Sequence, residues 1–141
     1  MAEEATHMAG PKPAHGTFCW TEIASSDLEQ SRSFFSNVFG WQIKDGDAET
    51  GGFKYLEFSS SGGDNPDGGM YEINPEWFGG NPPPPHLMVY IAVDDVDAAA
   101  KKASEIGGTI KKEPMDIPNV GRMAIVADPA GAVFSLFTPK L

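Results

Sequence analysis

The sequence predicts an α+β fold in which two copies of a β-α-β-β-β unit pack as one pseudo-two-fold body. Strand-like alternation of apolar residues changes to helical spacing and back again in the same order twice along the chain. The two helix starts, Asp27 and Asp95, lie 68 residues apart, and the glycines expected to end the helices, Gly40 and Gly108, keep the same offset. A ferredoxin-like sandwich or two unrelated small modules would give a similar string of elements, and both stay open as alternatives.

The first unit opens with a strand over residues 16–23, because Phe18, Trp20 and Glu22 fall on one face at a period of two. The helix that follows has apolar residues at helical spacing, namely Leu28, Phe34, Phe35 and Val38. Ser26 with Glu29 fits the S-x-x-E pattern of a capping box, and this predicts the helix start.

Three short strands complete the first unit. They are expected at residues 41–44, 53–59 and 69–73, because turn-forming stretches rich in Gly, Asp and Asn separate these apolar runs. A linker over residues 74–85 follows, in which four consecutive prolines remove backbone donors. The sequence thus predicts no regular structure in this linker.

The second unit repeats the first over residues 86–139. A strand is expected at 86–93, a helix at 94–108, and strands near 109–115, 122–127 and 132–137. The offset of 68 carries the third strand of the first unit onto 122–127, but the last strand slips to an offset of 63. That slip pairs Glu72 with Ser135.

Composition favours one domain over residues 16–141 after a disordered tail of residues 1–15, since 141 residues with 40% hydrophobic content suit a single core. A net charge of -10 argues against nucleic acid and anionic membranes as partners. The single cysteine, Cys19, cannot form an internal disulfide, so a reducing compartment fits. Since neither a bilayer-spanning stretch nor a signal peptide is recognisable, we expect a cytoplasmic protein.

Three segments, FCWTEIASSDLEQSRSFFSNVFGW, HLMVYIAVDDVDAAAKKASEIGGTI and DPAGAVFSLF, resemble the vicinal-oxygen-chelate superfamily of glyoxalases, bleomycin-resistance proteins and extradiol dioxygenases. The resemblance covers about residues 16–139. It implies that each unit curls into a partial barrel and that the concave faces of both units line a substrate cavity. Function follows less directly, because the superfamily includes lyases, isomerases, epimerases, dioxygenases and drug-binding proteins.

Metal-dependent members of this superfamily hold a divalent ion with residues on the first and last strands of each unit. Carried over, these positions fall on Trp20, Glu72, Met88 and Ser135. Only Glu72 is a suitable ligand, and catalytic sites need about three protein ligands, so we expect no metal cofactor. The alternative is a shifted set of Glu22, Glu72 and His86 around a divalent metal, as in a lyase or isomerase resembling lactoylglutathione lyase.

The expected function is therefore metal-independent binding of a small, partly apolar organic molecule, with Glu22 or Glu72 orienting its amine or hydroxyl group. The residues expected to line the cavity are Trp20, Glu22, Glu72, His86, Met88, Tyr90, Ser135 and Phe137, with Phe18 and Val133 beside them. Trp77 and Phe78 in the linker are candidates for a lid.

Two further functional readings stay open. If the protein is an enzyme, the resemblance implies a lyase or isomerase resembling lactoylglutathione lyase, or a dioxygenase. Glu22 and His86 are then its candidate acid-base residues, because histidine exchanges protons near neutral pH. The other reading is a non-catalytic interaction module whose cavity is filled by its own side chains. In every case a homodimer is expected, because family members commonly pair units across subunits and the strand edges otherwise stay exposed.

Overall fold

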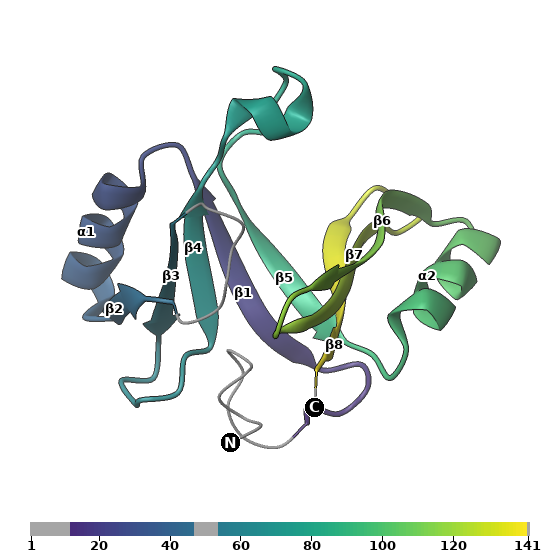
Figure 1. The fold of residues 1–141 in the computed structure, drawn as a ribbon, viewed down its shortest axis with the longest axis horizontal. Coiled ribbons are helices and arrows are strands. Elements are labelled where there is room, and N and C mark those ends of the chain that lie inside the picture. The colour runs from purple at the N-terminus through teal and green to yellow at the C-terminus, as the bar shows by residue number, and fades with distance from the viewer. Residues whose placement is uncertain (1–11, 47–53, 141) are drawn as a thin grey trace.

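The computed structural model describes residues 12–46 and 54–140 (Figure 1). Its elements are β1 (Phe18–Ser25), α1 (Leu28–Phe39), β2 (Gln42–Asp45), β3 (Tyr55–Ser59), β4 (Gly68–Glu72), the 3-10 helix η2 (Pro75–Phe78), β5 (His86–Ala92), α2 (Val96–Glu105), β6 (Thr109–Ile117), β7 (Gly121–Ala127) and β8 (Val133–Pro139). This order confirms the predicted α+β fold of two β-α-β-β-β units. In the described parts of the chain, neither helix has the length and apolar character needed to cross a bilayer.

All eight strands form one mixed sheet in the order β2-β3-β4-β1-β5-β8-β7-β6. The first strands of the two units, β1 and β5, pair antiparallel at its centre, and each pairs in parallel with the last strand of its own unit. Both helices lie at the two outer ends of the molecule, on the same face of this curved sheet (Figure 1). We call the face that carries the helices the outer face and the opposite one the inner face.

Each helix begins after an aspartate, and the two starts are equivalent. The carboxylate of Asp27 accepts a hydrogen bond from the Gln30 amide at 3.1 Å, and that of Asp95 accepts one from the Ala98 amide at 3.1 Å. The predicted capping box at Ser26 is therefore wrong by one residue, since Asp27 is the N-cap. Gly40 ends α1 in the left-handed conformation, with φ of 72°, as its sequence position predicts.

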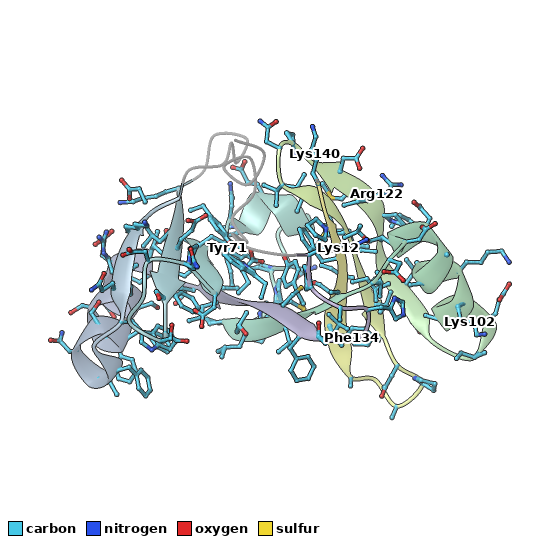
Figure 2. All side chains as sticks on the ribbon, turned by 90° about the horizontal axis from the view of Figure 1, so that it is seen from below. Lys12, Tyr71, Lys102, Arg122, Phe134 and Lys140 are labelled. Atoms are coloured by element: carbon cyan, nitrogen blue, oxygen red, sulfur yellow. The ribbon has the colours of Figure 1, made fainter. Side chains whose placement is uncertain are left out.

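The core consists of three apolar clusters, two on the outer face and one on the inner face. Under α1 lie Ile23, Leu28, Leu56, Phe58 and Met70. Under α2 lie Val93, Val96, Ala100, Ala124, Val126 and Leu136. The inner-face cluster consists of Trp20, Tyr90, Val120, Met123 and Phe137. Side chains from both halves of the sheet thus gather in the middle of the molecule (Figure 2).

Local irregularities correct three details of the sequence prediction. A bulge between Phe18 and Trp20 places Phe18 beside Ile91, off the inner face, and leaves it 78% exposed. The linker was expected to lack regular structure, yet it holds η2, whose N-cap Asn74 accepts from the Glu76 amide at 3.0 Å. The helix over 94–108 is shorter than predicted, because α2 spans Val96–Glu105.

The predicted tail of residues 1–15 lies mostly outside the described residues. Its last part contacts the second unit, since the Asp94 amide donates to Nδ1 of His15 at 3.0 Å. Lys12 lies 3.9 Å from the carboxylate of the same aspartate. The chain therefore enters β1 alongside the turn that precedes α2.

Candidate functional site

The inner face carries a polar cluster at the centre of the sheet, where the two units meet. On β1, Glu22 follows Trp20 at a period of two, so both side chains project from this face. The register across the central strands sets Trp20 beside Tyr90 and Glu22 beside Met88. The cluster therefore draws on the first strands of both units.

Glu22 is the centre of this cluster. Its Oε2 accepts a hydrogen bond from the Tyr55 hydroxyl at 2.8 Å, and its Oε1 accepts one from the Tyr90 hydroxyl at 2.9 Å. The indole Nε1 of Trp20 donates to the Tyr55 hydroxyl at 3.0 Å. Three strands, β1, β3 and β5, thus fix the orientation of one carboxylate.

Tyr55 reaches Glu22 only because Gly69 lies between their strands. On the inner face Gly69 is the lateral neighbour of Glu22, and a Cβ added there would lie 2.0 Å from the Tyr55 hydroxyl oxygen. Glycine at this position therefore lets the tyrosine ring cross β4 towards β1. No other residue would leave room for the ring in this conformation.

The environment of Glu22 shifts its proton affinity. Loss of solvent around the carboxyl group raises the pKa of Glu22 above its usual value, and the hydrogen bonds from Tyr55 and Tyr90 lower it part of the way back. The charge of His86 also acts to lower the pKa of Glu22. Burial raises the pKa of Tyr71 to about 12, and the negative charge of Glu22 adds to this increase.

The inner face divides into a packed part and a half-exposed part. Trp20, Tyr90 and Phe137 are 5%, 6% and 1% exposed and pack against the β6–β7 hairpin. Around Glu22 the side chains stay half-buried, and these are Tyr55, Tyr71, His86 and Met88. A ligand that approaches the carboxylate would therefore meet this second group first.

His86 lies on the inner face at the start of β5, beside Ala24 of β1. Its Nδ1 lies 2.7 Å from the carbonyl oxygen of Pro84, so that nitrogen carries the proton when it donates to this carbonyl. The proline-rich turn thus sets the orientation of the imidazole. Glu22 and His86, the two predicted acid-base candidates, are brought to the same part of the face.

Glu72, by contrast, lies on the outer face, which corrects the sequence prediction. It is the lateral neighbour of Ser25, whereas Glu22 is the neighbour of Gly69. Its Oε1 accepts a hydrogen bond from the Leu28 amide at 2.9 Å. Glu72 therefore satisfies a free amide at the start of α1 and is not brought together with Glu22 and His86.

The error arose in the register of the last strand. Glu22 pairs with Gly69, and its repeat equivalent Tyr90 pairs with Ser135. The last strands thus correspond at an offset of 66, and Gly69, not Glu72, is the equivalent of Ser135. The predicted offset of 63 differs from the observed offset of 66 by three residues. Because three is an odd number, the prediction assigned every side chain of β4 to the wrong face of the sheet.

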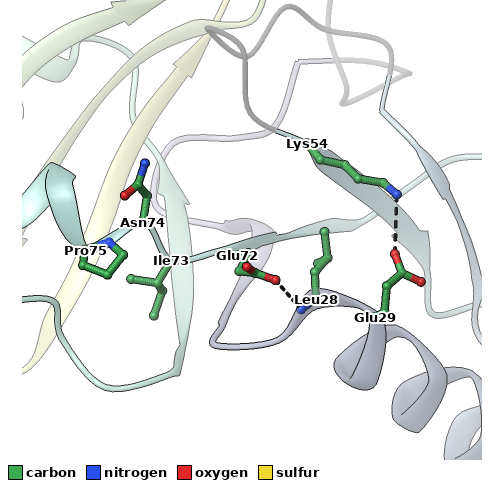
Figure 3. Close-up of a pocket in the computed structure, with 7 residues that line it drawn as sticks. All are labelled: Leu28, Glu29, Lys54, Glu72, Ile73, Asn74 and Pro75. Atoms are coloured by element: carbon green, nitrogen blue, oxygen red, sulfur yellow. Dashed lines mark hydrogen bonds and ion pairs between the residues drawn. The ribbon is translucent and has the colours of Figure 1, made fainter.

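Glu72 lines an open pocket of about 500 Å³ beside the start of α1 (Figure 3). Its other lining residues are Leu28, Glu29, Lys54, Ile73, Asn74 and Pro75. The Lys54 ammonium group lies 3.4 Å from the Glu29 carboxylate, so its charge is already balanced. This pocket lies on the outer face, away from the Glu22 cluster.

Of the four positions that the resemblance assigns to metal ligands, Trp20, Met88 and Ser135 lie on the inner face and Glu72 does not. The inner-face residue of β4 that corresponds to Ser135 in the repeat is Gly69. An indole, a hydrogen, a thioether and a hydroxyl are poor donors to a hard divalent ion. Within residues 12–46 and 54–140, no three His, Cys, Asp or Glu side chains come together in a way that could hold a metal.

The remaining predicted site residues differ in their burial and in their position relative to the inner face. Ser135 and Phe137 are buried on the inner face and fill it, whereas Val133 is 47% exposed at the start of β8. Trp77 and Phe78 belong to η2, but their side chains lie outside the described residues, so the lid stays a prediction. The thiol of Cys19 is half-buried, and burial raises its pKa to about 11.

Sequence reasoning missed Tyr55, Gly69 and Tyr71, which shape the surroundings of Glu22. Residues 53–59 were predicted to form a strand, but nothing in the sequence FKYLEFS indicated that Tyr55 would reach β1. That neighbourhood depends on the parallel pairing of β1 with β4, which no local pattern encodes.

Comparison with known proteins agrees with this architecture. Residues 17–136 match the Glyoxalase/Bleomycin resistance protein/Dioxygenase superfamily. A putative glyoxylase, CFP32, from Mycobacterium tuberculosis is 36% identical over 129 residues, which are 88% of this chain and 44% of the relative. The anthracycline biosynthesis protein DnrV from Streptomyces peucetius is 34% identical over 132 residues, covering 88% of this chain and 47% of the relative. The chain thus spans less than half the length of these relatives.

Among solved structures, methylmalonyl-CoA epimerase from Streptomyces coelicolor, bound to 2-nitronate-propionyl-CoA, superimposes with a TM-score of 0.58 and 18% identity. The match covers 91% of this chain and all (100%) of the epimerase. At this identity the likeness concerns the fold. The match across most of the sequence and the shared fold show that the chain belongs to the glyoxalase/bleomycin resistance protein/dioxygenase superfamily.

Proposed function

We propose that this chain binds a small, partly aromatic organic molecule on its inner face without the help of a metal, and that Glu22 anchors an amine or hydroxyl group of that molecule. The observation that carries the proposal is the carboxylate of Glu22, held by Tyr55 and Tyr90 among aromatic side chains. Aromatic walls with few, well-oriented polar groups are typical of small-molecule sites.

The carboxylate keeps capacity for a ligand. Among the described residues, each of its oxygens accepts one tyrosine hydrogen bond, and a carboxylate offers about four acceptor positions. A ligand ammonium or hydroxyl group can use the acceptor positions that the tyrosines do not. The net charge of -10 adds a general attraction for cations, so an amine is favoured over an acid.

The raised pKa of Glu22 fits the same role. A desolvated carboxylate is costly when it is unpaired, and a cationic partner placed beside it offsets this cost. Binding of an amine would therefore lower the pKa of Glu22 and hold the group ionised. The relative DnrV is named for anthracycline biosynthesis, and fused aromatic rings with a basic amino sugar combine both features that this face would recognise.

The metal-independent part of the proposal rests on the donor set. The resemblance to metal-dependent members gives ligand positions at Trp20, Met88 and Ser135 on the inner face. Gly69 is the inner-face residue of β4 that corresponds to Ser135, and none of these four residues is an imidazole or a carboxylate. Glu22, Glu57 and His86 are candidate donors on the inner face, but among the described residues no three His, Cys, Asp or Glu side chains come together as the ligands that catalytic ions generally need. Binding would therefore depend on stacking and charge rather than on a coordinated ion.

Calorimetric titration tests the proposal with a matched pair of probes, an anthracycline that carries a basic amino sugar and the corresponding uncharged aglycone. The amine is expected to bind about tenfold or more tightly than the aglycone, because a charge-assisted hydrogen bond contributes roughly 1.5–3 kcal/mol. Glu22→Gln should remove this preference. Glu113→Gln, which deletes the same charge from an exposed site on β6, should retain it.

Equal affinities of wild type and Glu22→Gln for both probes would contradict the proposal. The same titrations are repeated after chelator treatment and again with added nickel, zinc or manganese. Binding that appears only with a metal would favour a lyase or isomerase of the glyoxalase type. Absence of binding across a wider panel of fused aromatic amines would favour an interaction module with a filled inner face.

A further inference from the structure

The two halves of the inner face occupy equivalent positions of the repeat but carry different side chains. On β3, Glu57 is the lateral neighbour of Gly69, and its equivalent on β7, 68 residues later, is Ile125. On the first strands, Glu22 corresponds in the same way to Tyr90. The second unit therefore carries no acid at either of these two positions.

Packing of the sheet does not account for the carboxylate of Glu57. This side chain lies on the inner face, because Leu56 and Phe58 on either side of it pack into the core under α1. Glu57 is only 3% exposed, and glutamate is among the residues that are least often buried to this degree. Ile125 packs against the inner-face cluster at the equivalent position, so an aliphatic side chain suits this place in the fold. A buried acid that the fold does not require is more typical of a functional site.

Glu57 and Glu22 lie on opposite sides of Gly69, one strand away from it in each direction. Neighbouring strands are about 4.8 Å apart, so the two backbones are separated by roughly 10 Å. The ring of Tyr55 crosses this interval, since a Cβ added to Gly69 would lie 2.3 Å from the Cζ atom of that ring. The surface between the two acids is therefore aromatic. A flat ring can lie on it while groups at opposite ends of that ring extend towards the two carboxylates.

We propose that Glu57 is a second anchor of the ligand site and that the ligand is an aromatic diamine, with one ammonium group at Glu22 and the other at Glu57. This inference rests on the proposed binding of an amine at Glu22 and specifies the class of ligand. Two acids on one desolvated surface repel each other, and a dication offsets both charges. Because Glu57 is so little exposed, a primary ammonium group on a short methylene arm fits better than a bulky, substituted amine.

The basic residue beside Glu57 in the sheet leaves room for this role. Lys44 is the lateral neighbour of Glu57 on the edge strand β2, and its side chain is exposed. An ammonium group that is surrounded by water interacts only weakly with a carboxylate. A ligand ammonium enclosed beside Tyr55 would interact more strongly with Glu57, because the effective dielectric constant is lower there.

Calorimetric titration at low salt tests the second anchor with para-methylbenzylamine and para-xylylenediamine, which share one ring and differ by one ammonium group. The diamine should bind at least ~10-fold more tightly, beyond the about twofold that a second equivalent amine gives by statistics, because it adds a charge-assisted hydrogen bond. The ortho isomer of the diamine carries the same two groups on adjacent ring atoms and cannot span both acids. It should bind within ~3-fold of the monoamine.

Three variants locate the effect. Glu57→Gln should bring the affinity for the para diamine down to about that for the monoamine, whereas Glu22→Gln should weaken the binding of both probes. Glu113→Gln deletes the same charge from exposed β6 and should retain the preference for the para diamine. Glu57→Ile copies the second unit, so it should melt at or above the wild-type temperature while it loses the same preference.

The outcomes separate this inference from the proposed function. A preference for the para diamine that survives Glu57→Gln would overturn the second anchor, and so would equal binding of the para and ortho diamines. In both cases, weaker binding of the monoamine to Glu22→Gln would still support the proposed function. A lower melting temperature of Glu57→Ile would assign the acid to the fold and count against the second anchor. If Glu22→Gln binds both probes as wild type does, the proposed function and this inference fail together.

Discussion

At the residue scale, Glu22 depends on groups that lie far from it in the sequence. Tyr55 and Tyr90 hold its two oxygens, and Gly69 gives Tyr55 the space to do so. Trp20, Glu22 and Tyr90 were predicted to line the cavity from alternation together with the family resemblance, and this was possible because β1 after its bulge, and β5, keep a period of two. Tyr55 and Gly69 were not predicted, because a side chain that crosses a neighbouring strand leaves no local pattern.

Gly69→Ala should disrupt the cluster, because its Cβ would lie 2.0 Å from the Tyr55 hydroxyl oxygen. Tyr55 must then move, and overpacking of this kind costs roughly 1–3 kcal/mol. Urea denaturation measures the change in the free energy of unfolding. The control is Gly63→Ala in an exposed turn, where the nearest atom is 3.9 Å away. Equal stabilities of the two variants would show that Tyr55 does not need this gap.

Glu22→Gln should change how stability depends on pH. Since the folded-state pKa of Glu22 is raised, the folded protein disfavours the ionised form. The contribution of Glu22 to stability is thus fully present below its unfolded pKa, near 4.5, and is lost as the pH rises through its folded pKa. Relative to wild type, Glu22→Gln should gain stability as the pH rises from about 4 to 8, by about 1.4 kcal/mol per unit of raised pKa.

Denaturation of both proteins at a series of pH values gives this difference directly. Glu113→Gln on exposed β6 serves as the control for the loss of one charge. A difference between Glu22→Gln and wild type that is flat, or that falls with rising pH, would contradict a raised pKa for Glu22.

At the element scale, the repeat was predictable and the register of one strand was not. The helix starts at Asp27 and Asp95 lie 68 residues apart, and each aspartate caps its helix through an equivalent hydrogen bond. This shared local signal made the repeat recognisable in the sequence. The last strands of the two units follow turns of different length. Their offset was therefore predicted from the best match between the two short strand sequences. Because β4 begins with Gly68 and Gly69, its first residues show no alternation of side chains. The predicted offset of the last strand was therefore wrong by three residues.

Glu72 offers a test that separates its observed role from the predicted one. Glu72→Gln should lower stability by about 0.5–1 kcal/mol, because an anionic acceptor near the start of α1 is lost. The Glu72→Gln variant should bind aromatic amines with the affinity of wild type, since Glu72 lies on the outer face. Thermal melting and calorimetry measure the two effects. Weaker amine binding with unchanged stability would restore Glu72 to the ligand site.

The two N-caps allow a paired prediction. Asp27→Ala and Asp95→Ala should each cost about 1 kcal/mol in the free energy of unfolding, because each removes the same side-chain acceptor from a helix start. Chemical denaturation checks both. Asp27→Ala should be the milder change, since Glu72 still satisfies the Leu28 amide next to it. A clearly larger loss at Asp27 would contradict this reading of the α1 start.

At the scale of the whole molecule, repeated periodicity predicted the two-unit fold, because it survives small errors in register, and the resemblance of three segments predicted the family. The sequence did not predict which side chains of β4 project from the inner face. Glu72 projects from the outer face, so the alternative metal-ligand set of Glu22, Glu72 and His86 is not brought together. The inner face instead joins the oriented carboxylate of Glu22 to aromatic side chains from both units. We expect recognition of a cationic aromatic molecule at the junction of the two repeats.

The indole N–H of Trp20 is the most direct reporter of this expectation, because it donates to Tyr55, which in turn holds Glu22. Its nitrogen–proton NMR signal can be assigned with Trp20→Phe and followed while an amino-sugar anthracycline is added. We expect this signal to move and saturate with the calorimetric affinity, while the signal of Trp41 under α1 stays in place. Saturable binding that shifts Trp41 and leaves Trp20 unchanged would contradict a ligand site at Glu22.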